Sequence, residues 1–184
     1  MRNVVLVVDM VRGFYDIGPL ANPRTARIVP NVVNLLERKI ADGWLPVFLN
    51  DNHDPDDQEF DRFPPHCIVD SPEIELIPEL EKFRYNSLIF CKKSFSGFFG
   101  TTLNELLCKE RPEKVIVVGV CTDICVLHTV AGLYMRGYHQ IIVPKDCTET
   151  FSAPGHSAKK IKRWAYVHMT IVLGATIVQS QKEI

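Results

Sequence analysis

Short runs of aliphatic residues alternate with amphipathic segments along most of the chain. The first run, Val4–Val8, is hydrophobic at every position, which is typical of a strand buried on both faces of a parallel sheet. Runs of the same kind predict five further strands, at Leu45–Leu49, Ser87–Cys91, Lys114–Val120, Gln140–Val143 and Thr176–Val178. Apolar residues at helical spacing predict helices between them, at Arg24–Asp42, Thr101–Lys109, Asp123–Arg136 and Ser157–Val172.

This alternation predicts an α/β, doubly wound fold with three layers, in which a mainly parallel six-stranded sheet carries helices on both faces. Pro30 lies within the first predicted helix, so we expect its first turns to be split or kinked. The stretch Asp51–Pro72 is polar and interrupted by prolines, and loops of that length in compact domains usually carry function.

Composition restricts the class of protein. The 184 residues are 46% hydrophobic and 23% charged with a net charge of −1, which fits one globular domain spanning residues 1–184 and argues against disorder and against nucleic-acid binding. The longest apolar runs fall far short of the ~20 residues of a membrane helix. Asp9 follows the first run directly, which is unlike a signal peptide. We therefore expect a cytoplasmic protein with no membrane partner.

The six cysteines agree with a cytoplasmic location. A chain of this size buries a sufficient core without disulfides, so reduced thiols are expected. No C-x-x-C pair of a zinc ribbon or a thioredoxin is present, since Cys121 and Cys125 are four residues apart.

Ligands of doubly wound sheets bind beyond the carboxyl ends of the strands, at a topological switch point. Candidate functional residues therefore follow the predicted strands directly: Asp9, Asp51, His53, Lys92 and the stretch Cys121–Cys125. The turn after the first strand lacks G-x-G-x-x-G, and neither a P-loop nor a G-x-S-x-G elbow occurs, so nucleotide binding and serine hydrolysis are not indicated.

Cys125 stands near the predicted start of a helix, where the helix dipole and a nearby lysine are expected to lower the pKa of the thiol. A carboxylate could act as its general base, and backbone N–H groups of the same turn could hold an oxyanion. These are the parts of acyl transfer through a thioester, although strand-end aspartates and buried cysteines often serve packing alone.

Three ordered motifs resemble the isochorismatase-like cysteine hydrolases, and within them the nicotinamidases, over nearly the whole chain. The segment Val7–Phe14 is similar to the family's first strand, and Lys92–Phe98 with Gly100, Thr101 and Leu103 is similar to its K-x-x-x-S-A/G-F…T-x-L motif. The segment Val118–Val126 is similar to the nucleophile motif G-x-x-T-D-x-C-V.

The resemblance implies a role for each matched position. Asp9 is expected to be the catalytic base, Lys92 rather than Lys93 the catalytic lysine, and Cys125 the nucleophile. Phe14 is expected to line the substrate pocket. A cis peptide is implied before Cys121, so that the backbone N–H groups of Cys121 and Cys125 form the oxyanion hole.

The loop after the second strand offers Asp51, His53 and His66, a set suited to Zn²⁺, Fe²⁺ or Mn²⁺. Taken alone, D-x-H also fits a solvated polar loop. The loop resembles the D-x-H…W/F-P-x-H pattern of nicotinamidases, which implies that the metal binds the pyridine nitrogen and that Phe63 stacks on the ring. Glu59 resembles a variant in which glutamate is the fourth metal ligand.

Together these features predict a metal-dependent amidohydrolase of pyridine nucleotide salvage that converts nicotinamide to nicotinate and ammonia, with zinc as the first choice of metal. The resemblance also implies a homo-oligomer, a dimer or a tetramer. The nearest alternative is a cysteine hydrolase of the same fold that acts on N-carbamoyl compounds or other small amides. An isochorismatase, which lacks the cysteine and the metal motif, and a non-catalytic binding protein are the more distant alternatives.

Overall fold

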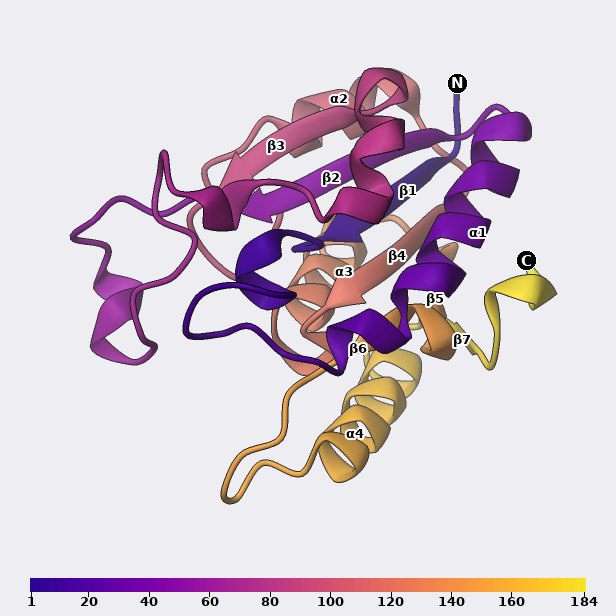
Figure 1. Cartoon of the computed structure of the whole chain (residues 1–184). Helices are drawn as coiled ribbons and strands as arrows, with labels where there is room; N and C mark the ends of the chain where they lie inside the picture. The colour runs from indigo at the N-terminus through magenta and orange to yellow at the C-terminus, as the bar shows by residue number, and fades with distance from the viewer.

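The computed structural model describes residues 1–184 and contains one parallel sheet (Figure 1). Its strands are β1 (Val4–Val8), β2 (Leu45–Asp51), β3 (Leu88–Lys92), β4 (Val115–Val120), β5 (Ile141–Pro144), β6 (Thr148–Glu149) and β7 (Thr176–Val178). Six of them follow the order β3-β2-β1-β4-β5-β7, and β6 pairs with β4 beyond the end of β5. The sheet therefore has seven strands rather than the six predicted, because β6 is too short to produce a hydrophobic run.

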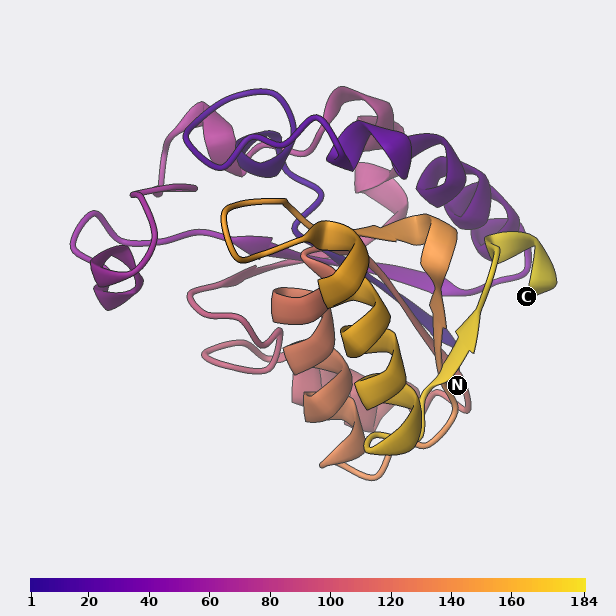
Figure 2. The ribbon, with the colours of Figure 1, turned by 90° about the horizontal axis from the view of Figure 1, so that it is seen from below.

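Helices cover both faces of the sheet, as predicted, and Figure 2 shows the three layers edge-on. The longer helices are α1 (Val29–Ala41), α2 (Leu103–Glu110), α3 (Leu127–Tyr134) and α4 (Ala158–Ile171). Single or irregular helical turns occupy Arg12–Phe14, Thr25–Arg27, Gln58–Asp61, Pro72–Ile74, Pro78–Asn86, Thr122–Val126, Lys145–Cys147 and Gln181–Glu183. None of the helices is both long and apolar enough to cross a membrane.

The first predicted helix is split, as expected from Pro30. A separate turn at Thr25–Arg27 precedes α1, and Pro30 occupies the first turn of α1, where its missing N–H leaves no hydrogen bond unmade. The turn Thr25–Arg27 is therefore separate from the continuous helix α1.

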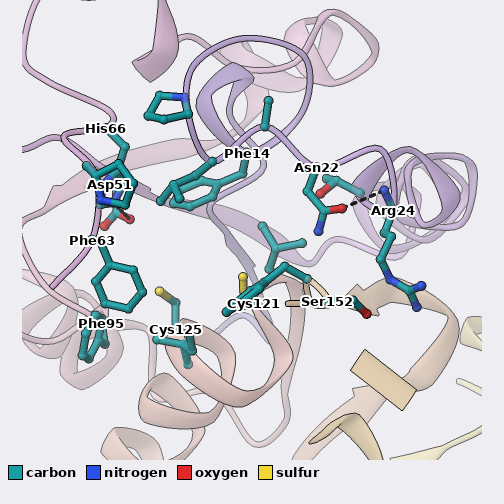
Figure 3. A pocket seen from close by; sticks show the side chains of 18 of the residues that line it. Phe14, Asn22, Arg24, Asp51, Phe63, His66, Phe95, Cys121, Cys125 and Ser152 are labelled. Atoms are coloured by element: carbon teal, nitrogen blue, oxygen red, sulfur yellow. Dashed lines mark hydrogen bonds and ion pairs between the residues drawn. The ribbon is translucent and has the colours of Figure 1, made fainter. Parts of the chain in front are cut away.

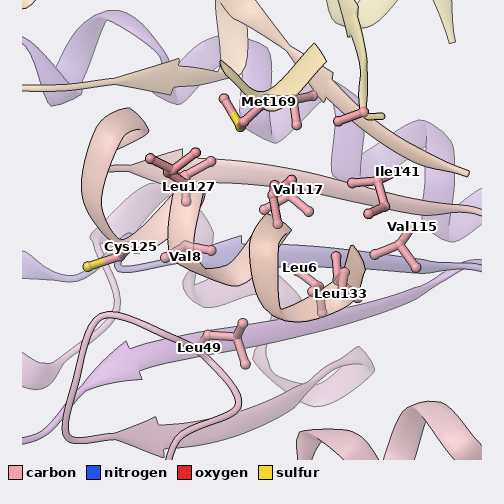
Figure 4. Packing of buried hydrophobic residues seen from close by; sticks show 14 of the residues in the cluster. Leu6, Val8, Leu49, Val115, Val117, Cys125, Leu127, Leu133, Ile141 and Met169 are labelled. Carbon is pink, nitrogen blue, oxygen red and sulfur yellow. The ribbon is translucent and has the colours of Figure 1, made fainter. Parts of the chain in front are cut away.

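Alternate residues of the strands point into two separate cores. Leu6, Val8 and Val117 pack with α2, α3 and α4 on one face, and Figure 4 shows this cluster with Cys125 at its edge. Val5 and Val7 pack with α1 and Pro78–Asn86 on the other face. Fully buried central strands of this kind explain the continuous aliphatic runs in the sequence.

The strand order brings the carboxyl ends of β1, β2, β3 and β4 together. Val8 pairs with Leu49 on one side and with Gly119 on the other, while Asp51 pairs with Lys92. Gly119 has φ 113°, and a Cβ there would lie 2.0 Å from the Val8 carbonyl oxygen, so only glycine allows this close approach. The residues that follow these strands therefore share one small region.

Candidate functional site

Asp9, Lys92 and Asp51 form a buried, charged cluster at the carboxyl edge of the sheet. Lys92 Nζ lies 2.8 Å from Asp9 Oδ2 and also forms an ion pair with Asp51. The Asp51 N–H donates to Asp9 Oδ1 at 2.8 Å. All three side chains are almost completely buried, and Asp9 adopts φ 51°, a left-handed conformation uncommon outside glycine. Two carboxylates thus share one ammonium group away from solvent.

Cys125 brings a thiol to the same cluster from the irregular turn Thr122–Val126. Its Sγ lies within 4.8 Å of carboxylate oxygens of Asp9 and Asp51. The peptide bond between Val120 and Cys121 is cis, in agreement with the resemblance. The expected juxtaposition of Asp9, Lys92 and Cys125 is present.

The protonation of this cluster differs from the expectation for the thiol. Burial raises the pKa of Cys125 well above its usual value, the charges on Asp9 and Asp51 raise it further, and Lys92 only partly opposes them. Burial, together with the charge on Asp51, raises the pKa of Asp9 to about 6. At neutral pH the resting site therefore holds a neutral thiol beside an ionised carboxylate that can accept its proton.

Lys92 stays charged in spite of its burial. Desolvation alone would lower the pKa of this amine, but the carboxylates of Asp51 and Asp9 outweigh desolvation and hold the pKa well above its usual value. The same ion pair keeps the pKa of Asp51 low, although burial alone would raise it. Lys93 instead points to solvent and pairs with Asp54, so the structure places Lys92 alone at the cluster.

Asp51, His53 and His66 converge as a candidate metal centre. Their ligand atoms all lie within 4.8 Å of one another, with His53 Nε2 3.6 Å from Asp51 Oδ1 and His66 Nε2 3.8 Å from Asp51 Oδ2. Ligand atoms bound to one zinc at ~2.0–2.2 Å have spacings of about 3–4 Å. Two histidines and one carboxylate leave positions open on a divalent ion.

The Nδ1 atom of each histidine has a hydrogen-bond partner of its own. His53 Nδ1 contacts Asp57 Oδ2 at 3.0 Å, and His66 Nδ1 contacts the Pro64 carbonyl at 2.8 Å. Both contacts favour a proton on Nδ1 and direct Nε2 toward the centre, as in many metal sites. Asp57 is therefore a support for His53 rather than a ligand.

Two further observations fit a bound cation. His53 Nε2 is buried and has no hydrogen-bond partner in the protein. Burial alone would lower the pKa of His53, but Asp51 and Asp57 raise it to about 9, so the space beside this ring attracts positive charge. The residues present thus fit a divalent metal, with Glu59 less closely placed: its Oε1 lies 3.8 Å from His66 Nε2, and it falls outside the compact cluster of ligand atoms.

A cavity of about 590 Å³ opens beside Cys125 and the candidate metal centre (Figure 3). Phe14 and Phe63 line it as expected, and Phe63 meets Phe95 edge-on with ring centroids 6.1 Å apart. The Cys125 sulfur points toward the cavity between Phe63 and Cys121 (Figure 3). Aromatic walls next to a thiol and polar groups suit a small flat substrate.

Sequence reasoning missed several residues of the cavity. Phe95 lies within the matched segment Lys92–Phe98. Only the structure shows that its side chain lines the cavity. The segment 19–25 and the residues Phe151 and Ser152 also line the cavity, and neither stretch carries a motif that marks it. His53 is the one predicted metal-site residue that does not line the cavity, and it is completely buried.

Comparisons with known proteins agree with this geometry. Nicotinamidase 1 of Arabidopsis thaliana is 31% identical over 86% of this chain and 73% of its own length. N-carbamoylsarcosine amidase from Thermoplasma acidophilum has 31% identity and a TM-score of 0.86, covering 100% of this chain and 99% of that one. Pyrazinamidase of Pyrococcus horikoshii, solved in complex with zinc, has 25% identity and a TM-score of 0.84, covering 97% and 99%.

The family model of the isochorismatase domain matches residues 3–174, which include every residue of the cluster, the candidate metal centre and the cavity described above. The chain therefore belongs to the isochorismatase family, and it is an amidohydrolase of that family.

Proposed function

We propose that the chain is a metal-dependent nicotinamidase, which hydrolyses nicotinamide to nicotinate and ammonia through a thioester on Cys125. The observation that carries this proposal is the placement of the Cys125 sulfur within 4.8 Å of the Asp9 carboxylate, beside an aromatic cavity and a two-histidine, one-carboxylate centre. The nicotinamidase and pyrazinamidase relatives support the choice of a pyridine or pyrazine amide.

In the proposed reaction, Asp9 accepts the Cys125 proton as the sulfur forms a bond to the amide carbon. Lys92, whose Nζ lies 2.8 Å from Asp9 Oδ2, stabilises the negative charge as it moves from Asp9 to the sulfur and then to the carbonyl oxygen. The carbonyl oxygen becomes an oxyanion held by the backbone N–H groups of Cys121 and Cys125, each worth about 3 kcal/mol of barrier. Asp9 then returns the proton to the leaving nitrogen, the carbon–nitrogen bond breaks, and ammonia departs.

The second half of the reaction releases the acid. Asp9 takes a proton from water as the water oxygen bonds to the thioester carbon, and the carbon–sulfur bond breaks. The proton then returns from Asp9 to the Cys125 sulfur, which restores the resting site. Burial of the thiol serves this step, because a raised thiol pKa favours the neutral form at the end of each cycle.

Asp51, His53 and His66 would hold the metal, and Glu59, whose Oε1 lies 3.8 Å from His66 Nε2, would stand beside them as the candidate fourth ligand. A divalent ion there supplies a Lewis-acidic position for the ring nitrogen of the substrate, and we propose zinc on the basis of the zinc-bound relative. Phe14 and Phe63 position the ring between this centre and Cys125.

The experiment is an ammonia-release assay on nicotinamide, pyrazinamide and N-carbamoyl amides, with and without a chelator. We expect turnover of the two ring amides, its loss on chelation, and its recovery with added zinc. Cys125→Ala should abolish release while the fold is retained, and Cys108→Ala, which removes an exposed thiol on α2, should leave the activity unchanged. Turnover that survives Cys125→Ala would refute the mechanism.

The N-carbamoylsarcosine amidase relative favours one alternative substrate class, the N-carbamoyl compounds. Chelator-insensitive turnover confined to these compounds in the same assay would select that alternative. With nicotinamide as substrate, we further propose a role in pyridine nucleotide salvage in the cytoplasm, where a reducing medium keeps Cys125 as a thiol, and a homo-oligomeric assembly.

A further inference from the structure

Large exposed hydrophobic side chains are concentrated on one helix. Eleven such side chains lie at the surface of the protein, and two of them are at the end of α3, which packs beside α4 (Figure 2). Four more, between 49% and 76% exposed, belong to α4 and its C-cap: Trp164, Val167, Ile171 and Val172. A surface helix normally presents polar residues to water, so this face of α4 lacks a partner.

Three of these residues form a narrow row that we call the α4 stripe: Trp164, Val167 and Ile171. Positions three and seven residues apart lie within an arc of about 60° on a helix with 100° per residue. Ala165 and Met169 lie on the opposite side of the helix and pack into the core. The α4 helix is therefore apolar on two sides, and the spacing of the outer side is that of the seam between two packed helices.

Positive charge gathers in the first half of the same helix. The first six residues of α4 include Lys159, Lys160, Lys162 and Arg163, and the whole helix has no acidic residue. Only Lys162 has an acidic partner, Glu149 at 2.9 Å. Cations near a helix N-terminus oppose the helix dipole, whereas cations beside the C-terminus of a second helix are favourable. The charge pattern therefore fits a partner helix that runs in the opposite direction.

We propose that the α4 stripe is the centre of a two-fold interface, in which α4 packs antiparallel against α4 of a second copy of this chain. With the two-fold axis beside Val167, Trp164 lies against the partner's Ile171, so that one stripe complements itself. Lys160 then lies near the C-terminal end of the partner's α4. The inference rests on the homo-oligomeric assembly proposed above, and it is independent of the reaction.

The size of the exposed surface suits a dimer. An interface of standard size buries about 800 Å² on each partner around an apolar centre. An enclosed tryptophan buries ~150–250 Å², so Trp164, at 54% exposed, offers on the order of 100 Å². At about 100 Å² each, the six side chains of α3 and α4 supply roughly 600 Å², and polar neighbours supply the rim. An apolar arc of about 60° is typical of a helix–helix seam rather than of a face that enters a lipid membrane.

Analytical ultracentrifugation at micromolar protein concentration tests the surface. We expect the parent protein to be a dimer, or a tetramer made of two such dimers. Val167→Glu places two negative charges beside the axis, so it should raise the dissociation constant of this interface at least about 100-fold. Tyr85→Glu changes a 95% exposed side chain in the segment that covers the other face of the sheet, and it should leave the mass unchanged.

Engineered cysteines test the direction of the two helices, in a protein whose exposed Cys91 and Cys108 are replaced by alanine. Two copies of position 167 meet at the axis, so Val167→Cys should form an intermolecular disulfide on copper-catalysed air oxidation. Two copies of position 159 lie roughly 24 Å apart at 1.5 Å per residue, well beyond the ~7 Å between Cα atoms that a disulfide allows. Lys159→Cys should therefore form no such disulfide.

Several results would overturn the interface. These are a parent protein that is monomeric, an oligomer that persists unchanged in Val167→Glu, and a disulfide that forms as readily through Lys159→Cys as through Val167→Cys. Vesicles of phosphatidylcholine and phosphatidylserine test the other occupant. A monomeric parent protein that sediments with the vesicles, while Val167→Glu does not, would assign the α4 stripe to a lipid surface.

Ammonia release from nicotinamide, measured on the same samples, separates this inference from the nicotinamidase proposal. Val167 lies outside the cavity, so a dissociated Val167→Glu protein should keep the kcat/KM of the parent. A parent oligomer that is inactive on nicotinamide but dissociates on Val167→Glu would support the interface and refute the nicotinamidase proposal. An active parent protein whose oligomer ignores Val167→Glu would do the reverse.

Discussion

Replacement of Lys92 by methionine tests the charge balance of the buried cluster. The ammonium group is fully buried, lies 2.8 Å from Asp9 Oδ2, and is also paired with Asp51. Methionine occupies nearly the same volume, so the change removes the charge and leaves the packing largely intact. Two buried carboxylates then face each other without a counter-charge.

The expected cost follows from breaking a buried ion pair by removing one partner, which is about 3–5 kcal/mol of the free energy of unfolding. The folded variant reduces this cost by binding a proton on Asp9 or Asp51. A protein that holds a carboxyl group with a raised pKa in its folded state becomes less stable as the pH rises. Its free energy of unfolding falls by up to about 1.4 kcal/mol per pH unit for one proton. In the unchanged protein Asp9 is mostly ionised above about pH 6. The deficit should therefore grow by about 2 kcal/mol between pH 6.5 and pH 8.

Urea unfolding of both proteins at these two pH values measures the deficit, with a chelator present so that no bound metal compensates Asp51. The matched control is Lys93→Met, the same exchange at the neighbouring exposed position, which should leave the free energy of unfolding unchanged at both pH values. A Lys92→Met deficit below about 1 kcal/mol, or one that shrinks as the pH rises, would refute the reasoning.

Three further outcomes are expected. The kcat/KM for nicotinamide should fall about tenfold per pH unit below pH 6, because protonated Asp9 cannot accept the thiol proton; a pH–rate profile that is flat down to pH 4.5 would contradict this. Gly119→Ala should cost at least about 3 kcal/mol in urea unfolding, since its Cβ would meet the Val8 carbonyl, whereas stability like that of the parent would show that the strand ends can move apart. His156 Nε2 lies 2.9 Å from Asp123 Oδ2 and so links the loop of Ser152, which lines the cavity, to the turn that carries Cys125. His156→Ala should therefore raise KM several-fold and leave kcat unchanged. A fall in kcat alone would assign His156 a different role.

Much of the fold could be predicted from the sequence because buried parallel strands leave unbroken aliphatic runs. Val4–Val8 matches β1 residue for residue, and the other five predicted strands agree with the structure to within one or two residues at each end. Strand β6 escaped prediction because its two residues, Thr148 and Glu149, pair with β4 without forming a hydrophobic run. Strand β6 is recognised only by its pairing with β4, which no pattern in the sequence reveals.

Some features of the candidate site could likewise be predicted from the sequence, and others could not. The juxtaposition of Asp9, Lys92 and Cys125 could be predicted because Asp9 follows β1, Lys92 ends β3 and Cys125 lies in the turn after β4, and because all three lie in matched motifs. The raised pKa of the Cys125 thiol could not be predicted, since it results from burial among residues distant in sequence. The segment 19–25, which lines the cavity, gave no signal either, because its position depends on how the chain before α1 packs in three dimensions.

Rapid-quench mass spectrometry of the zinc-loaded protein mixed with nicotinamide would detect the proposed thioester on Cys125. We expect a transient adduct of one nicotinoyl group in place of one hydrogen, located on the peptide that contains Cys125 and absent from Cys125→Ala. Ammonia release at full rate with no such adduct at any quench time, or an adduct on another residue, would contradict it.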